Sequence, residues 1–221
     1  MVLSALTVVA GAVDAVTFLA IGHVFAALTT GNLLLLGFGV ANEATPVVRP
    51  AEALVAFVVG AALGHAAIRW AAGHKKHWFA MALAVEVAMV AAAGGYALSF
   101  KGVMSAHRSS ATLGLLSGAM GWRSRALLEA KIPDMPTTVV QVTLVQVVLD
   151  ALSWRNSTSR STSLTVARRI STVLGLFLGA ALGALLLKLG VGKALLCVSA
   201  LEAGAVALYV RDSHFLSRVS N

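Results

Sequence analysis

Charged residues are scarce in this chain. Asp, Glu, Lys and Arg make up 12% of its 221 residues, whereas hydrophobic residues make up 58%. Soluble domains carry roughly 25% charged residues, so too few polar groups remain to cover a water-soluble globule of this size. Disordered chains, which combine high charge with low hydrophobicity, are excluded as well. We therefore expect an all-α polytopic membrane protein that forms a single transmembrane domain over residues 1–221.

Cysteine and the common catalytic motifs are also nearly or wholly missing. Cys197 is the single cysteine, which excludes a disulfide framework and a cysteine zinc site. Its apolar neighbours predict a small buried side chain. No nucleophile elbow, HExxH, Walker loop or GxGxxG occurs, so we expect no enzyme, no cofactor and no metal site. The first ten residues lack the positive segment of a signal peptide and are expected to begin the first membrane helix.

What is abundant is apolar sequence, interrupted by basic residues. The apolar blocks do not alternate with period two, which indicates helices, and at about 20 residues per span the chain has room for about six to eight crossings. The net charge is +8, and most Lys and Arg lie at block ends and in loops. This pattern is typical of contact with anionic lipid at a bilayer surface, not with nucleic acid. The blocks cover residues 3–20, 24–40, 53–68, 78–98, 111–122, 139–152, 170–187 and 191–210.

Two halves of the chain resemble each other. Residues 58–64 (VVGAALG) resemble residues 177–183 (FLGAALG), and the next block in each half carries one acid, Glu86 or Glu202. We expect two copies of one unit, residues 1–98 and 110–210, each with a broken first element. The copies are inverted if each crosses an odd number of times. With six crossings the Lys and Arg count favours both termini in the cytoplasm, whereas with eight it favours neither side.

Asp14 and the Thr29-Thr30-Gly31-Asn32 run interrupt the first apolar stretch. An acid inside a span must face a cavity or find a partner, so Asp14 is either a proton or substrate site or a structural contact to the next helix. Gly31 permits a non-helical turn, and Thr30 and Asn32 can satisfy the backbone groups that it frees. The run is either the break of a substrate site or a plain turn between two helices. Thr137 and Thr138 would form the corresponding break in the second half.

The remaining polar residues within or beside spans have two readings each. Glu86 and Glu202 are symmetrically placed and serve either proton coupling or a helix–helix hydrogen bond, since small residues surround both. Arg123 and Arg125 end a short block and either extend to the interface or offer an anion contact. His65 is expected to be a packed or hydrogen-bonded histidine.

Two motifs resemble those of a known family. Gly118-x-Met120-Gly121, followed by Pro136-Thr137-Thr138, resembles the second motif of the YoaK-like family of bacterial inner-membrane proteins, whose function is not established. The family's more specific opening motif has its counterpart in Gly11, Asp14, Ala15, Phe18, Phe25 and the Thr30-Gly31-Asn32 run. The resemblance spans nearly the whole chain. It implies a multi-pass membrane protein, described in some cases as a small-molecule transporter, with no established substrate.

The second half departs from that family in two places. This chain has Arg123-Ser124-Arg125 where the family tends to have Gln-Asn-Ala. It has Gln141-Val142 where the family tends to have a second Thr-Gly. If that Thr-Gly pair builds half of a site, that half is altered here.

The leading hypothesis is a small secondary transporter or permease of the inner membrane, with an unidentified small-molecule substrate. The alternative is a non-transporting membrane scaffold or assembly partner, and a homo-oligomer is left open. A polar, water-accessible cavity that reaches Asp14 and Asn32 would favour transport; a solid apolar interior with Asp14 in a closed hydrogen bond would favour the scaffold. The expected substrate or ion site comprises Asp14, Thr30, Gly31, Asn32, Thr137, Thr138, Glu86 and Glu202.

Overall fold

The chain folds as a bundle of helices. The computed structural model describes residues 2–41, 46–72, 78–99, 105–130, 145, 148 and 160–219. Five of the helices in these ranges are long and apolar enough to cross a membrane, which confirms the predicted all-α polytopic class. In chain order the elements are α1 (Val2–Val16), the π-helical turn η1 (Thr17–Gly22), α2 (Thr29–Ala41), α3 (Val48–Ala72), α4 (Trp78–Leu98), α5 (Ala106–Glu129), α7 (Arg160–Leu186), the short 3-10 turn η3 (Leu187–Leu189) and α8 (Val191–Val219).

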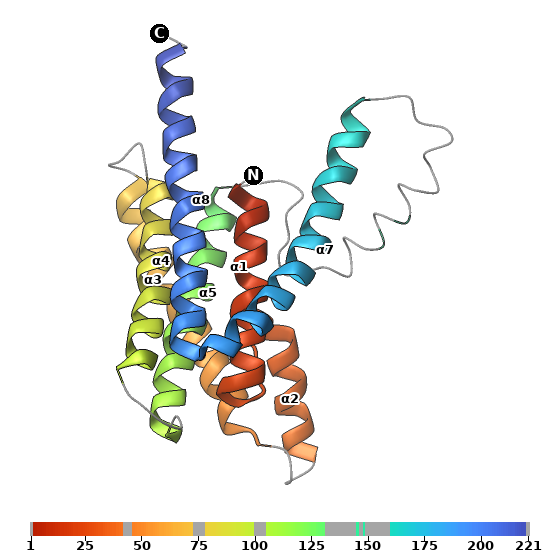
Figure 1. Cartoon of the computed structure of the whole chain (residues 1–221), viewed down its shortest axis with the longest axis vertical. Coiled ribbons are helices and arrows are strands. Elements are labelled where there is room, and N and C mark those ends of the chain that lie inside the picture. The colour runs from red at the N-terminus through yellow and green to blue at the C-terminus, as the bar shows by residue number, and fades with distance from the viewer. Residues whose placement is uncertain are drawn as a thin grey trace.

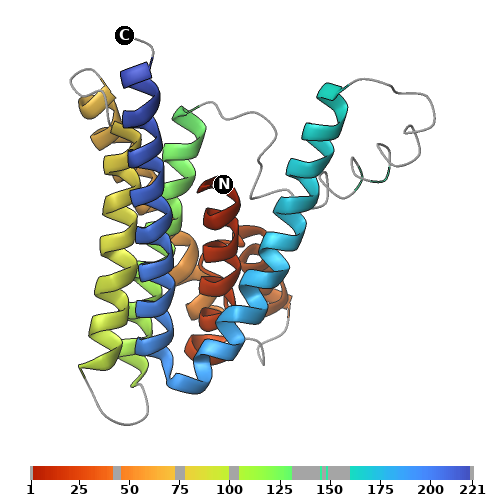
Figure 2. The ribbon, with the colours of Figure 1, turned by 45° about the horizontal axis from the view of Figure 1, so that its top comes forward.

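The long helices alternate in direction. In Figure 1, α1, α4 and α7 run downward while α3, α5 and α8 run upward, so the start of α1 and the end of α8 lie toward the same end of the bundle. The shorter α2 lies beside the lower end of α1. Seen from the tilted view of Figure 2, α4 and α8 stand side by side, and α7 leans away from them.

Helix α5 is polar yet forms the interior. It is not among the five helices with the composition of a membrane span. It nevertheless buries a full face of small, apolar and hydroxyl side chains, from Ser109 to Ala126, against α3 and α4. The predicted block of residues 111–122 is therefore too short: the helix continues through Arg123 and Arg125 because neighbouring helices, not lipid, surround its polar face.

Glycines let two helix pairs approach backbone to backbone. A side chain at Gly60 of α3 would overlap the carbonyl group of Gly118 on α5. In the second pair, a side chain at Gly179 of α7 would overlap the backbone of Val8 on α1, and one at Gly183 would overlap the backbone of Ala12. Small residues at helix contacts are the main source of packing energy in a membrane, where burial of apolar surface gives little.

The outer surface is apolar, as a lipid-facing surface must be. Large side chains of α3 and α7 point outward, among them Leu63 at 60% and Phe177 at 69% exposure. Cys197 is also exposed, on α8, so the prediction that it is buried is wrong. Apolar neighbours do not distinguish the interior from the lipid face, because both are hydrophobic in a membrane protein.

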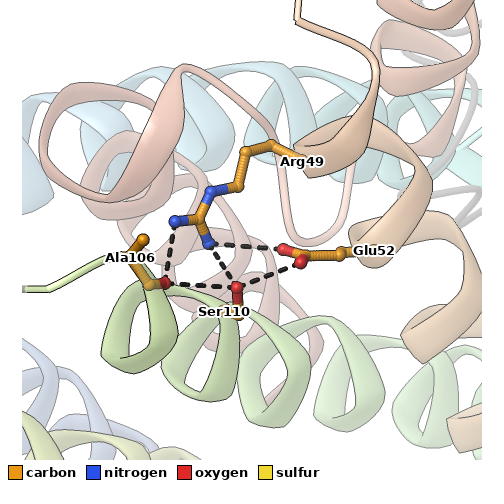
Figure 3. Close-up of polar contacts among 4 residues, drawn as sticks. All are labelled: Arg49, Glu52, Ala106 and Ser110. Carbon is orange, nitrogen blue, oxygen red and sulfur yellow. Dashed lines mark hydrogen bonds and ion pairs between the residues drawn. The ribbon is translucent and has the colours of Figure 1, made fainter.

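A polar cluster joins the starts of α3 and α5 (Figure 3). The Arg49 guanidinium donates to Ser110 Oγ at 2.8 Å and to the Ala106 carbonyl at 2.9 Å, and it pairs with Glu52 at 3.3 Å. Ser110 in turn donates to Glu52 Oε1 at 3.0 Å. These contacts tie α3 to the N-terminal turn of α5 at the lower end of the bundle.

Candidate functional site at the broken first helix

The first membrane element is broken, as the sequence predicts. Helix α1 continues into the π-helical turn η1, which ends at His23 in the left-handed conformation (φ 55°). Residues 23–28 are not helical, and α2 begins at Thr29. The break therefore precedes the Thr29–Asn32 run, whose residues form the first turn of α2. A break inside a membrane leaves backbone amides that need partners within the protein.

Asp14 supplies two of those partners. Its Oδ1 accepts a hydrogen bond from the Ala27 amide at 2.7 Å, and its Oδ2 accepts one from the Leu28 amide at 3.2 Å. Both carboxylate oxygens thus hold the chain that leads into α2. Of the two predicted roles, the structural contact to the next helix is present.

Asn32 holds the other side of the break. Its Oδ1 accepts from the Phe25 amide at 2.9 Å and its Nδ2 donates to the Phe25 carbonyl at 2.6 Å, so one side chain satisfies a whole peptide unit. Gly31 lies under the Phe25 ring, and a Cβ there would sit 2.8 Å from a ring carbon. Asn32 and Gly31 therefore shape the break itself.

Beside the break lies a cavity of about 330 Å³. This volume falls in the lower part of the range of small-molecule sites. Its wall is mainly apolar, with the Phe18 and Phe25 rings stacked 4.9 Å apart, and its charged groups are Asp14 and Arg123. The lining comes from α1, the break, α2, α5 and α7: Ala10, Gly11, Asp14, Ala15, Phe18, Leu19, Phe25, Ala27, Leu28, Thr29, Thr30, Met120, Arg123, Ser124, Leu176 and Ala180.

Arg123 is buried between the cavity and the interior. Its Nη1 donates to the Leu6 carbonyl of α1 at 3.0 Å, and its Nη2 lies 2.7 Å from Met120 Sδ. Nη1 also lies 3.0 Å from Oε1 of Glu86 on α4. Of the two roles predicted for this arginine, extension to the membrane interface is wrong, because its partners lie inside the bundle.

Glu86 and Glu202 meet behind Arg123. Both side chains are fully buried, on helices α4 and α8, which pack against each other, and both interact electrostatically with Arg123. Among the residues that the structure describes, no donor stands in hydrogen-bond geometry to any of their four oxygens. One guanidinium is thus the charged neighbour of two buried carboxyl groups that lack hydrogen-bond donors.

The predicted site residues fall into three groups. Asp14 and Thr30 line the cavity, Glu86 and Glu202 lie behind it, and Asn32 and Gly31 shape the break without lining the cavity. Thr137 and Thr138 lie outside the described residues. The predicted site omitted Arg123, which joins the first two groups. Its position directly after the apolar block of residues 111–122, six residues before the end of α5, was the available signal.

Arg125 and His65 form a separate contact on the outer part of the same helix. Arg125 Nε donates to His65 Nδ1 at 3.1 Å and its Nη2 pairs with Glu129 at 2.6 Å. His65 is thus hydrogen-bonded, one of the two states that the sequence predicts for it.

The helices and the buried charges together define the class: this is a polytopic α-helical membrane protein in which the non-helical residues 23–28 separate the first candidate span from the shorter apolar helix α2. The chain belongs to the family described as "Protein of unknown function (DUF1275)", which matches residues 2–209. Neither the curated proteins nor the solved structures contain a match to it.

Proposed function

We propose that the protein is a secondary transporter of a small molecule, and that the cavity beside the break is its binding site. The observation that carries the proposal is the cavity itself, which brings Asp14 and Arg123 to one wall inside an otherwise apolar bundle. Discontinuous helices with charged groups beside them are a recurrent way of building substrate sites in transporters. Glu86 or Glu202 would be the acid that couples a proton to transport.

The cavity wall limits the substrate class. Two stacked phenylalanines and several aliphatic side chains favour an apolar or aromatic body, whereas Arg123 and the hydroxyl groups of Thr29, Thr30 and Ser124 favour a polar end. A small amphipathic organic molecule fits this combination, since small-molecule sites combine apolar walls with a few polar groups that fix orientation.

Helix pairing supports the proposed repeat. Helix α3 of the first half packs on α5 of the second, and α7 of the second half packs on α1 of the first. In the same way, α4 of the first half packs on α5 of the second, and α8 of the second half packs on α1 of the first. Helices α4 and α8 also pack on each other. The pairings among these six long helices are preserved when α1, α3 and α4 are exchanged with α5, α7 and α8. Opposite helix directions in the two sets favour inverted copies, the arrangement that supports alternating access in many transporters.

The scaffold alternative draws on two observations of its own. Both oxygens of Asp14 are occupied by backbone amides, and the glycine contacts of α1 and α3 are those of tight structural packing. We favour transport because a scaffold does not need a cavity beside a buried arginine.

The proposed setting of the protein is a bacterial inner membrane, and the basis for this is the resemblance to the YoaK-like family. Both termini would lie in the cytoplasm, and anionic lipid would contact the basic loops.

The test is transport by the purified protein in proteoliposomes. Uptake or charge movement is measured for a panel of small aromatic and aliphatic acids, amines and amino acids, with and without a pH gradient. Ala15→Phe fills the cavity from α1 without altering a charge, and Ala203→Phe makes the same change at an exposed position of α8. We expect transport by the wild type and by Ala203→Phe, and its loss in Ala15→Phe. Equal transport by both variants would refute the cavity as the site, and no transport of any compound would favour the scaffold.

A second pair of variants addresses the break. The double variant Asp14→Ala/Asn32→Ala removes the side chains that hold it, and we expect transport to be lost. Transport equal to that of the wild type would show that the break plays no part in binding. Size-exclusion profiles of both proteins control for misfolding.

A further inference from the structure

Arg123 contacts both the cavity and the buried acids. Its guanidinium lines the cavity and pairs with Glu86. A guanidinium has five N–H donors, and its described contacts are the Leu6 carbonyl, Met120 Sδ and Glu86 Oε1. The pair with Glu86 is close but lies outside hydrogen-bond geometry. This contact can therefore give way to a better-aligned carboxylate without loss of a strong hydrogen bond.

The charges of the buried group do not balance unless a proton is present. Two ionised glutamates and one arginine leave one negative charge in a site closed to water, which is unfavourable. One proton on either Glu86 or Glu202 makes the group neutral.

We propose that Glu86, Glu202 and Arg123 form a proton-binding site that takes up one further proton for each carboxylate ligand that Arg123 binds in the cavity. The proposal rests on the proposed function of the cavity as a ligand site. In the balanced step, a ligand carboxylate and one proton from water enter together. The ligand pairs with Arg123, the proton binds the remaining glutamate, and the buried group stays neutral. Release of the ligand returns the proton, so the coupled movement carries no net charge.

Asp14 does not offer an equivalent site for a cation. Both of its oxygens already accept amide hydrogens of the break, at 2.7 and 3.2 Å, so part of its charge is compensated by the backbone. The aromatic pair of Phe18 and Phe25 lies in the same wall. The wall therefore fits a planar carboxylate with an aromatic body, oriented with its charge on Arg123.

Few other charged groups act on this site. On α4 and α8 the groups are Glu86 and Glu202 themselves, on α5 the group is Arg123, and on α1 it is Asp14, which senses Arg123 from the cavity side. Of these four groups the three acids can bind a proton, whereas Arg123 stays charged. Asp14 is therefore the described alternative to Glu86 and Glu202 as the acceptor of the proton.

The experiment is calorimetric titration of the full-length protein in lipid nanodiscs with benzoate, in two buffers of different ionisation enthalpy. The buffer dependence of the binding heat gives the number of protons taken up. We expect about one proton per benzoate, since the ligand adds one negative charge to a buried group that tolerates none. Benzamide has the same shape without the charge and is the matched control; any binding of it should take up no proton. Empty nanodiscs give the partition background.

Variants separate the acids from the cavity. Either acid alone can still accept the proton, so Glu202→Gln should keep the uptake, whereas the double variant Glu86→Gln/Glu202→Gln should bind benzoate with none. If the double variant does not fold, infrared spectra replace it. The ligand-free wild type should then show the carbonyl band of one buried carboxylic acid, and Glu202→Gln should lack it.

The outcomes distinguish this proposal from the previous one. Benzoate binding without proton uptake would overturn the coupling and leave the cavity as a ligand site. Absence of benzoate binding would overturn the carboxylate site, while transport of other compounds, blocked by Ala15→Phe, would still support the proposed function. Proton uptake that persists in the double variant would assign the proton to another group, such as Asp14, and also overturn the proposal.

Discussion

Replacing Arg123 with methionine isolates the electrostatics of the bundle interior. Methionine is long, flexible and apolar, so it fills much of the space of the arginine stem. The change removes the partner of Glu86 at 3.0 Å and the donor to the Leu6 carbonyl. It leaves both acids buried without a counter-charge, and their four oxygens gain no donor among the residues described.

The expected cost is large. Removal of one member of a buried ion pair destabilises proteins by about 3–5 kcal/mol, because the remaining charge stays buried and unpaired. Removal of both members of the pair costs less, because one buried acid, Glu202, then remains without a counter-charge instead of two. The double variant Glu86→Gln/Arg123→Met should therefore unfold at higher denaturant than Arg123→Met alone, although it carries one more substitution.

Equilibrium unfolding in mixed micelles measures this difference. Arg125→Met is the matched control on the same helix, because Arg125 pairs with the 40%-exposed Glu129, and an exposed ion pair contributes at most about 1 kcal/mol. If Arg123→Met and Arg125→Met cost the same, or if the double variant loses the sum of its two single changes, the buried pair does not act as described.

Three further changes test the break and the helix contacts by unfolding in the same micelles. Asp14→Ala should cost about 2–6 kcal/mol, since two backbone amides each lose a charged acceptor at about 1–3 kcal/mol apiece; a loss below about 1 kcal/mol would show that water replaces the carboxylate. Asn32→Leu should cost about 2 kcal/mol or more, because one peptide unit loses both of its partners, and hydrogen exchange of the break should rise; unchanged exchange would contradict this. Gly60→Leu should prevent the contact with Gly118 and lower the yield of folded protein, whereas Gly204→Leu, on the exposed face of α8, should leave it unchanged; similar yields would rule out close packing at Gly60.

The sequence predicts class and discontinuity well because both depend on local composition. Continuous apolar blocks give the helical membrane fold, and the Thr-Thr-Gly-Asn run lies within one turn of the actual break. The exact position of the break was wrong, since the π-helical turn before His23 depends on what packs around it. Asp14 was predicted to need a partner, and its partners proved to be amides of the same discontinuous element.

Arg123 could not be placed from local pattern. It follows an apolar block, as an interfacial arginine does, and its counter-charge lies on another helix, 37 positions earlier in the chain. The matching positions of Glu86 and Glu202 in the two halves indicated related roles, but contact between them depends on α4 packing against α8. The prediction that Cys197 is buried was wrong for another reason: apolar neighbours in the sequence do not distinguish a lipid-facing position from the protein interior.

The polarity of α5 has a consequence for the order in which the bundle is assembled. An arginine at the centre of an isolated membrane helix raises the cost of insertion by about 2.5–3.5 kcal/mol, which is an upper value for Arg123, six residues from the end of α5. Synthesis runs from the N-terminus, so α1 and α4 already carry the Leu6 carbonyl and Glu86 when α5 emerges, and the arginine can enter the membrane as a neutralised pair. Glu202 arrives last, on α8, when that pair is complete. The second acid then has no positive charge left to pair with, and under the proposal above one of the two acids carries a proton.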